Sequence, residues 1–236
     1  MDIAEKKRPE FTGETFIPCG SPKYIADDHF ARYKFAMKYA DNKTVLDIAC
    51  GAGYSAPLFI KAGAVSYTGV DIKDELVCFA NQEYGSPQGK FMVGDICSFN
   101  DNSQYGLIVC FETIEHVKDY QSALANLFLL LEPGGTLLIS SPNRRRSSPR
   151  ALRLSDKPAN EFHVQEFLPD ELLEELHKAG FETTEDYLYG QRLLSRGIIG
   201  ALKTLVNREG MFLSPKVSLV KDRNPEFFVI VANKPK

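Results

Sequence analysis

The sequence predicts an α/β fold, a doubly wound and mostly parallel sheet with helices on both faces. Three observations support this prediction. Short apolar runs, of which Val45–Ala49 is the first, alternate with segments of helical periodicity. A Gly-x-Gly turn, Gly51–Gly53, directly follows the first run. Acidic residues stand at the ends of later runs, at the edge where a parallel sheet binds its ligands.

The first strand–turn–helix unit begins at Val45–Ala49, an apolar run typical of a strand buried in a parallel sheet. Gly51 and Gly53 carry no Cβ, so the chain can turn sharply there and its backbone can approach a ligand closely. Tyr54–Ala62 is then expected to form the helix that returns along the sheet. Because the ligand of such a sheet lies outside the carboxyl end of the strand, this turn predicts the position of a cofactor.

The same alternation continues along the chain. A helix capped by Asp27 or Asp28 is expected to run through Tyr39 and to pack at the sheet edge. Strands are expected at Val65–Asp71, Phe91–Ile96, Tyr105–Glu112, Leu131–Ser140, Phe181–Tyr189 and Glu226–Ala232, and helices at Asp74–Tyr84, Tyr120–Leu131 and Pro169–Ala179.

The chain is expected to form one domain, residues 27–236, preceded by a polar leader or lid segment at residues 1–26. Two elaborations, at about 142–167 and 192–222, are far longer than ordinary connections. Within the second, Leu193–Val206 predicts a packed lid, with weak contact to a membrane surface as the alternative.

Composition limits the classes of function and partner. The net charge of −3 provides no basic field, so we expect no nucleic-acid partner. The five cysteines are scattered without a Cys-x-x-Cys pair, which favours buried reduced thiols, and we expect no metal. We predict no transmembrane segment and no signal peptide, hence a cytoplasmic protein, either a monomer or a homodimer.

The residues at the strand ends bear on the identity of the cofactor. Gly51–Ala56 also fits the dinucleotide pattern Gly-x-Gly-x-x-Gly/Ala, and Asp71 suits the ribose of either a nicotinamide or an adenosyl cofactor. Asp47, just before the turn, would repel a pyrophosphate and attract an amino group. Together with Asp95 and Glu112 at later strand ends, it favours a cationic cofactor that bears an amino group.

In this order, the strand-end segments resemble those of the class I S-adenosylmethionine-dependent methyltransferases of the small-molecule branch, over roughly Asp28 to Pro142. The resemblance implies a Rossmann-like seven-stranded sheet with an antiparallel edge strand and an added lid region. It also implies S-adenosylmethionine as the cofactor and S-adenosylhomocysteine as the product. The implied cofactor-binding residues are Asp47, Ala49, Gly51, Gly53, Asp71, Ile72, Asp95, Ile96, Phe111 and Tyr33.

Two flanking segments, His29–Ala36 and Asn160–Phe167, resemble a bacterial subgroup that makes or decorates glycans and sugar-bearing metabolites. The resemblance implies that a small-molecule or glycan acceptor is methylated on a hydroxyl of a sugar, a nucleotide-sugar or a glycan. Methylation of an amino-sugar nitrogen or of a quinone precursor stays open. An NAD-dependent oxidoreductase and a non-catalytic adenosyl-binding protein are the alternatives from other classes.

A hydroxyl acceptor needs a base, and a histidine titrates in the right range. His116 and His163 are the candidate bases, although either could merely orient its loop, and Glu112 is the third catalytic candidate. His29 and Arg32, one turn apart on a helix, and Glu166 are candidate acceptor-binding residues. The arginine run 144–153 is either a solvated surface or a phosphate site, and Arg144 and Arg145 are its candidate ligands.

Overall fold

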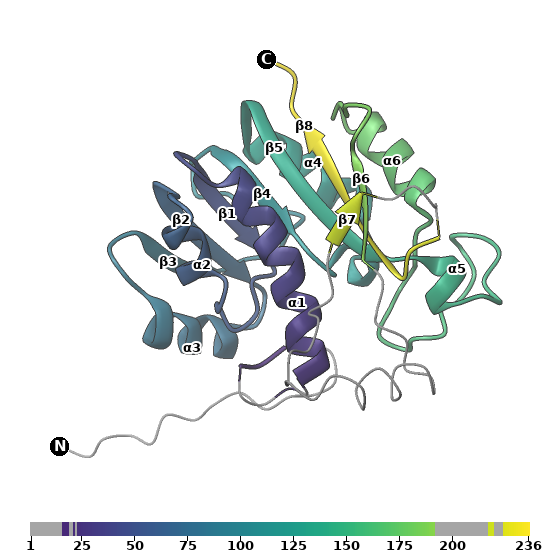
Figure 1. Cartoon of the computed structure of the whole chain (residues 1–236), viewed down its shortest axis with the longest axis horizontal. Helices are drawn as coiled ribbons and strands as arrows, with labels where there is room; N and C mark the ends of the chain where they lie inside the picture. Colours follow the sequence, from purple (N-terminus) through teal and green to yellow (C-terminus); the bar gives the residue numbers. More distant parts are fainter. Residues whose placement is uncertain (1–15, 19–20, 22, 192–216, 220–223) are drawn as a thin grey trace, which may run out of the picture.

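The computed structural model describes residues 16–18, 21, 23–191, 217–219 and 224–236 (Figure 1). Its centre is one eight-stranded sheet in the order β3-β2-β1-β4-β5-β8-β6-β7. The strands are β1 (Thr44–Ile48), β2 (Ser66–Asp71), β3 (Gly89–Val93), β4 (Tyr105–Cys110), β5 (Leu131–Pro142), β6 (Leu188–Gln191), β7 (Val217–Leu219) and β8 (Phe227–Asn233). Strands β1 to β5 pair in parallel, as the alternation of elements predicts.

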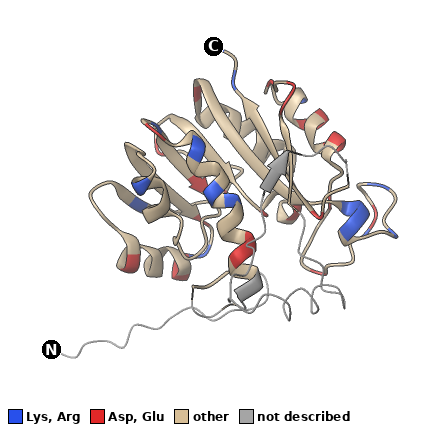
Figure 2. Cartoon of the chain, viewed as in Figure 1, with Lys and Arg blue, Asp and Glu red and all other residues tan. Residues whose placement is uncertain are grey.

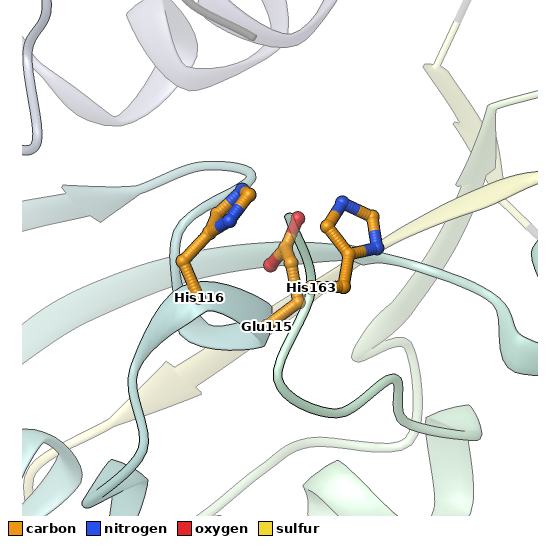
Figure 3. A group of neighbouring side chains, drawn as sticks. All are labelled: Glu115, His116 and His163. Atoms are coloured by element: carbon orange, nitrogen blue, oxygen red, sulfur yellow. The ribbon is translucent and has the colours of Figure 1, made fainter. Parts of the chain in front are cut away.

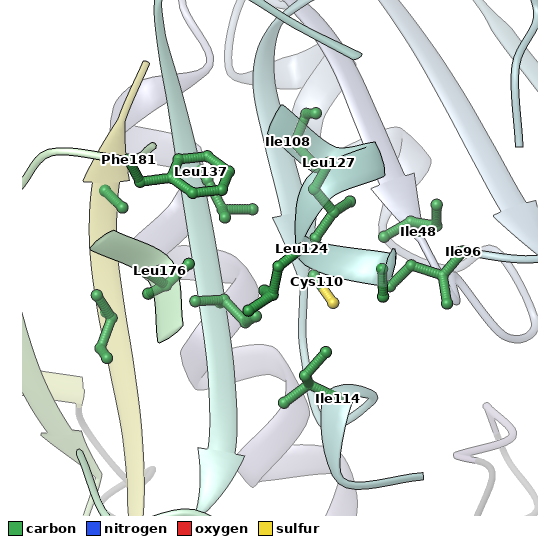
Figure 4. Close-up of a cluster of buried hydrophobic side chains, with 14 of the residues drawn as sticks. Ile48, Ile96, Ile108, Cys110, Ile114, Leu124, Leu127, Leu137, Leu176 and Phe181 are labelled. Carbon is green, nitrogen blue, oxygen red and sulfur yellow. The ribbon is translucent and has the colours of Figure 1, made fainter. Parts of the chain in front are cut away.

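Helices cover both faces of this sheet. They are α1 (Lys23–Ala36), α2 (Ala56–Lys61), α3 (Asp74–Tyr84), α4 (Tyr120–Leu130), α5 (Arg144–Ser147) and α6 (Pro169–Lys178), with 3₁₀ turns η1 (Met37–Tyr39) and η2 (Ile114–His116). Successive residues of β4 show the two layers: Ile108 packs in the core beneath α4 and α6, and Val109 packs in the core beneath α1, α2 and α3. Figure 4 shows the first core, where Leu124 and Leu127 of α4 meet the sheet.

The late strands extend the predicted sheet in a specific way. β8 pairs antiparallel with both β5 and β6 and so lies inside the sheet, and the sheet ends in an antiparallel edge strand, β7, as expected. The short strand β7 is an eighth strand, added beyond β6. The strand expected at Phe181–Tyr189 is shorter and later, Leu188–Gln191, and Phe181 is buried against the ring of Phe128. Before it, Glu182 makes an isolated antiparallel bridge with Asn233 of β8.

Several boundaries differ from those expected. The strand expected at Phe91–Ile96 is Gly89–Val93, and the helix expected at Tyr54–Ala62 is Ala56–Lys61. Helix α1 begins at Lys23, inside the segment expected to be a leader, and Asp27 and Asp28 lie within it and do not cap it. The 142–167 segment contains the short helix α5, which Asn143 caps by accepting a hydrogen bond from the Arg145 amide. The expected lid at Leu193–Val206 and most of residues 1–26 lie outside the described residues. Among the helices that are described, none combines the length and apolarity needed to cross a membrane.

Candidate active site

A cavity of about 1050 Å³ opens at the carboxyl ends of the parallel strands. Residues that follow β1, β2, β3 and β4 form one wall, and α1 and the 142–167 segment form most of the rest, with Phe16 and Phe227. Two non-glycine residues of this wall, Ala49 after β1 and Glu112 after β4, have left-handed backbone angles, φ 61° and φ 49°. Such strained conformations concentrate at functional sites, so they mark these two strand ends as candidates for ligand contact.

The turn after β1 is held by the carboxylate of Asp71 at the end of β2. Its Oδ2 accepts the backbone N–H of Gly51 at 2.8 Å, and its Oδ1 accepts the N–H of Lys73 at 3.0 Å. Gly51 lines the cavity, but Gly53 does not: a Cβ there would lie 2.6 Å from the Ala80 Cβ. Gly53 therefore lets the turn pack against α3, which differs from the ligand contact expected of it.

Asp47 lies behind the cavity wall and is fully buried. Its carboxylate accepts hydrogen bonds from the hydroxyls of Ser55 (2.5 Å), Tyr67 (2.9 Å) and Tyr33 (3.2 Å). Burial raises the pKa of Asp47 to about 6, although these three hydroxyls favour the charged form. The position of Asp47 does not favour the direct contact with a cofactor amino group that the sequence predicted. Tyr33 connects Asp47 to the cavity, because its ring lines the wall.

The residues expected at the adenine end all line the cavity. The side chain of Ile72 is 66% exposed, a large apolar surface left open to solvent at the cavity. Asp95 and Ile96 lie beside it, and Asp95 Oδ1 accepts the Cys97 N–H at 2.8 Å. An apolar surface next to a carboxylate suits the flat face and the amino group of an adenine ring.

Glu112 and Phe111 form the wall that follows β4. The hydroxyl of Ser140, on the neighbouring strand β5, donates to Glu112 Oε1 at 2.6 Å and accepts the Glu112 N–H at 3.0 Å. This pair of hydrogen bonds fixes the left-handed residue and directs its carboxylate at the cavity.

His116 and His163, which are far apart in the sequence, meet in the cavity wall (Figure 3). Their ring centroids are 4.9 Å apart and the rings are nearly perpendicular. His116 Nδ1 lies 3.0 Å from the carbonyl oxygen of Phe162. A carbonyl only accepts, so Nδ1 carries the proton and Nε2 is the basic nitrogen of this ring.

His163 is held from both sides. Its Nδ1 lies 2.6 Å from Glu166 Oε1, and its Nε2 lies 2.9 Å from the side-chain nitrogen of Asn160. Glu166 is itself buried and accepts the Ser147 hydroxyl at 2.5 Å. The positions of these groups make His163 an orienting residue and leave His116 as the stronger candidate base.

Glu115 is the residue of this site that the sequence analysis did not select. Glu115 is 1% exposed, and its carboxyl group lies between the two imidazoles (Figure 3). Burial, and then the charge of Glu112, raises its pKa well above the usual range of a glutamate. The sequence did offer one indication that Glu115 belongs to the site: it directly precedes His116, in a segment that also contains Glu112 at the strand end.

On α1, His29 and Arg32 also face the cavity. The ring of Phe16 stacks on His29 at 5.2 Å, and burial, followed by the charge of Arg32, lowers the pKa of His29 well below its usual value. Arg32 is 2% exposed and donates from Nη1 to Gln191 Oε1 at 3.0 Å. A neutral imidazole and a buried guanidinium thus lie side by side in this wall.

The two arginines expected to bind a phosphate lie elsewhere. Arg144 is buried and forms two 2.6 Å hydrogen bonds with the carboxylate of Glu171, so its guanidinium ties the 142–167 segment to α6. Arg145 is exposed on α5, in the basic area visible in Figure 2, and does not line the cavity. Their positions do not favour the substrate contact that the arginine run suggested.

Comparison with known proteins now bears on this geometry. The family model described as "Methyltransferase domain" matches residues 24–186, which include α1, the glycine turn and the His116–His163 pair. The chain belongs to the class I S-adenosylmethionine-dependent methyltransferases. The cofactor of this family is S-adenosylmethionine, which confirms the sequence-based prediction of the cofactor.

Among the relatives of this methyltransferase, a Mycolicibacterium smegmatis protein named "Probable S-adenosylmethionine-dependent methyltransferase/" is 31% identical over 74% of the chain and 66% of its own length. The ubiquinone biosynthesis O-methyltransferase of Coxiella burnetii is 34% identical over 43% of the chain and 44% of its own length. The chain therefore spans less than two thirds of the curated relatives it matches.

The methyltransferase fold is shared with solved structures. The N-methyltransferase NodS from Bradyrhizobium japonicum, in complex with S-adenosylhomocysteine, superposes with a TM-score of 0.63 and 15% identity, over 93% of this chain and 91% of that chain. The mostly parallel, doubly wound sheet expected from the sequence is confirmed. The residues of this methyltransferase fit the cofactor, because the exposed Ile72 and the acids Asp71 and Asp95 surround one end of the cavity.

Proposed function

We propose that this chain transfers a methyl group from S-adenosylmethionine to a hydroxyl of a small-molecule acceptor, a sugar, nucleotide-sugar or glycan. The observation that supports it is the side chain of His116, which lines the same cavity as the cofactor-side residues. Its Nδ1–H is donated to the Phe162 carbonyl, so Nε2 is the basic nitrogen that would take the proton of a hydroxyl.

The cofactor, when bound, supplies a methyl group already activated on a sulfonium. Asp71 is expected to accept the ribose hydroxyls, Asp95, Ile96 and Ile72 to hold the adenine, and the Gly51 turn to contact the methionine part. The remaining task of the chain is to align the acceptor oxygen behind the methyl carbon. Alignment of this kind contributes about 7–11 kcal/mol to lowering a barrier in favourable cases.

In this proposal His116 Nε2 takes the proton of the acceptor hydroxyl, a role worth about 10²–10⁴-fold in rate. His163, fixed by Glu166 and Asn160, packs edge-on against His116 and keeps that ring in place. Arg32 and His29 are expected to contact the acceptor from α1.

A phenolic hydroxyl is the second candidate acceptor, because one relative is named as a ubiquinone biosynthesis O-methyltransferase. Both acceptors would use the same base. A nitrogen acceptor differs, because an amine attacks without a base, so loss of His116 would leave its methylation nearly intact.

The test is calorimetric titration of the purified protein with S-adenosylmethionine, S-adenosylhomocysteine and NAD. Binding of the two adenosyl ligands, weakened at least about tenfold by Asp71→Ala, is expected. Asp101→Ala is the matched control, because Asp101 pairs with Lys90 away from the cavity. Label transfer from tritiated S-adenosylmethionine to a panel of nucleotide-sugars, glycans and phenols then identifies the acceptor. Preference for NAD, or no adenosyl binding, would refute the proposal.

A further inference from the structure

We propose that Glu115, His116 and His163 together bind one divalent transition-metal cation, which holds the acceptor hydroxyl for methyl transfer. The inference rests on the proposed function and deepens it.

The three side chains bring their ligand atoms close together. One ligand atom from each residue, an imidazole nitrogen of each histidine and a carboxylate oxygen of Glu115, all lie within 4.8 Å of one another. Neighbouring ligands of a bound cation are about 3–3.5 Å apart when the metal–ligand bonds are about 2.1 Å. Shifts of about 1 Å in these side chains therefore close the site. Figure 3 shows the Glu115 carboxylate between the two rings, so the three groups converge on one region.

The Glu115 side chain is buried with one carboxylate oxygen unpaired. The residue is 1% exposed, and its Oε2 has no hydrogen-bond partner within the part of the chain that the structure describes. A buried carboxylate without a partner is costly, and native structures pair such groups with a charge or a metal. A cation between the imidazoles supplies the missing partner.

Both imidazole rings are held by acceptors at Nδ1. His163 Nδ1 donates to the buried carboxylate of Glu166, and His116 Nδ1 donates to the Phe162 carbonyl. Metal-binding histidines characteristically donate their second ring N–H to a carboxylate or a backbone carbonyl. Both rings are thereby held with Nε2 as the basic nitrogen. The cation replaces the Asn160 side chain as the partner of His163 Nε2.

The scaffold of the site is rigid although its ligands come from two distant segments. The backbone carbonyl of Glu115 accepts the Val164 N–H at 2.9 Å. The side chain of Gln165, 6% exposed, donates to the carbonyls of Ile114 and Val117 at 2.8 and 2.9 Å. Hydrogen bonds on both sides of the ligands thus fix the spacing between the 142–167 segment and η2 before any cation binds.

The chemistry of the ligands selects the cation. Two imidazoles and one carboxylate suit Zn²⁺, Mn²⁺ or Fe²⁺, and an all-oxygen set would be expected for Mg²⁺ or Ca²⁺. The three protein ligands leave a position for the acceptor hydroxyl, whose acidity rises when its oxygen binds the cation. Its proton passes to water, the oxygen–carbon bond forms as the carbon–sulfur bond breaks, and the electron pair stays on the sulfur of S-adenosylhomocysteine. With the cation bound, His116 acts as a ligand and the cation replaces it as the group that activates the hydroxyl.

The test is calorimetric titration of protein stripped by chelator with Zn²⁺ and, separately, Mn²⁺. One ion per chain is expected, with affinity lowered at least about 100-fold in Glu115→Gln and His163→Asn. Glu166→Gln removes only the group behind His163 and should weaken binding by about 10–100-fold. His177→Asn is the matched control, because His177 is an exposed histidine on α6 and its loss should change nothing.

S-adenosylhomocysteine binding, measured in the same proteins, separates this inference from the proposed function. Intact binding of that ligand shows that the variants are folded. No bound cation, or equal affinity in the wild type and all four variants, would overturn the metal site. Methyl transfer that persists undiminished in chelator-treated protein would also overturn it and would leave the proposed function standing with His116 as the base.

Discussion

Replacement of Asp47 by asparagine should change how the stability of the protein depends on pH. The carboxyl group is fully buried, and its pKa in the folded protein is about 6. In the unfolded chain the pKa returns to about 3.9. Between these two values the folded protein binds a proton that the unfolded chain has lost, so the free energy of unfolding falls as the pH rises.

The size of the effect follows from the two pKa values. A difference of about two units, at about 1.4 kcal/mol per unit, corresponds to about 3 kcal/mol. Stability from this residue is fully present below about pH 4, is lost progressively up to about pH 6, and is constant above that. Asp47→Asn removes the titrating carboxyl group and keeps the shape of the side chain. In the variant the free energy of unfolding therefore lacks the part of its pH dependence that comes from residue 47.

Urea unfolding of both proteins at intervals from pH 4 to pH 7.5 measures the effect. Other groups titrate in both proteins, so the difference between the two unfolding free energies isolates Asp47. It should change by about 3 kcal/mol across the range, in favour of the variant as the pH rises. Tyr67→Phe removes a hydroxyl that stabilises the charged form of Asp47, so the pH range over which stability is lost should extend to higher pH. A constant difference across the range would refute the reasoning.

Other substitutions test the turn and the arginine run. Gly53→Ala should cost about 3 kcal/mol in urea unfolding, because its φ of +78° disfavours a side chain and the new Cβ would clash with α3. Gly134→Ala, with a φ of +77° and only ordinary contacts, is the control and should cost about 1 kcal/mol; equal losses would contradict the clash. Arg144→Met should cost about 3 kcal/mol by leaving Glu171 without its buried partner. Arg145→Met, at the exposed neighbouring position, should change the free energy of unfolding by less than about 0.5 kcal/mol and leave methyl transfer unchanged. A loss of methyl transfer in this variant would instead support the substrate contact that the sequence suggested.

The local parts of the fold and site were predictable from the sequence. Helix α3 has the bounds expected of it, Asp74–Tyr84, because its apolar spacing and flanking residues are encoded within one stretch. Asp71 and Asp95 reach the cavity because the carboxyl ends of parallel strands converge at one edge of the sheet.

Contacts between distant segments were not predictable in this way. The Glu115–His163 cluster depends on how the 142–167 segment folds back onto η2, and spacing along the chain contains no such information. The partnership of Arg144 with Glu171 was hidden for the same reason: a run of arginines reads as a surface when its acidic partner lies on a later helix. The Gly-x-Gly motif likewise did not reveal that its two glycines have different surroundings, Gly51 at the cavity and Gly53 against α3.

The two halves of the cavity wall are built from separable parts of the chain. The turns after β1, β2 and β3 form the side that we propose holds the cofactor, and the stretch between β5 and α6 contributes His163, Phe162 and Glu166. That stretch is attached to the rest by a few polar anchors, chiefly Arg144 and Gln165. If the proposed function holds, substitutions in residues 146–162 would alter the acceptor side of the cavity and leave His163, the anchors and the turns after β1, β2 and β3 in place.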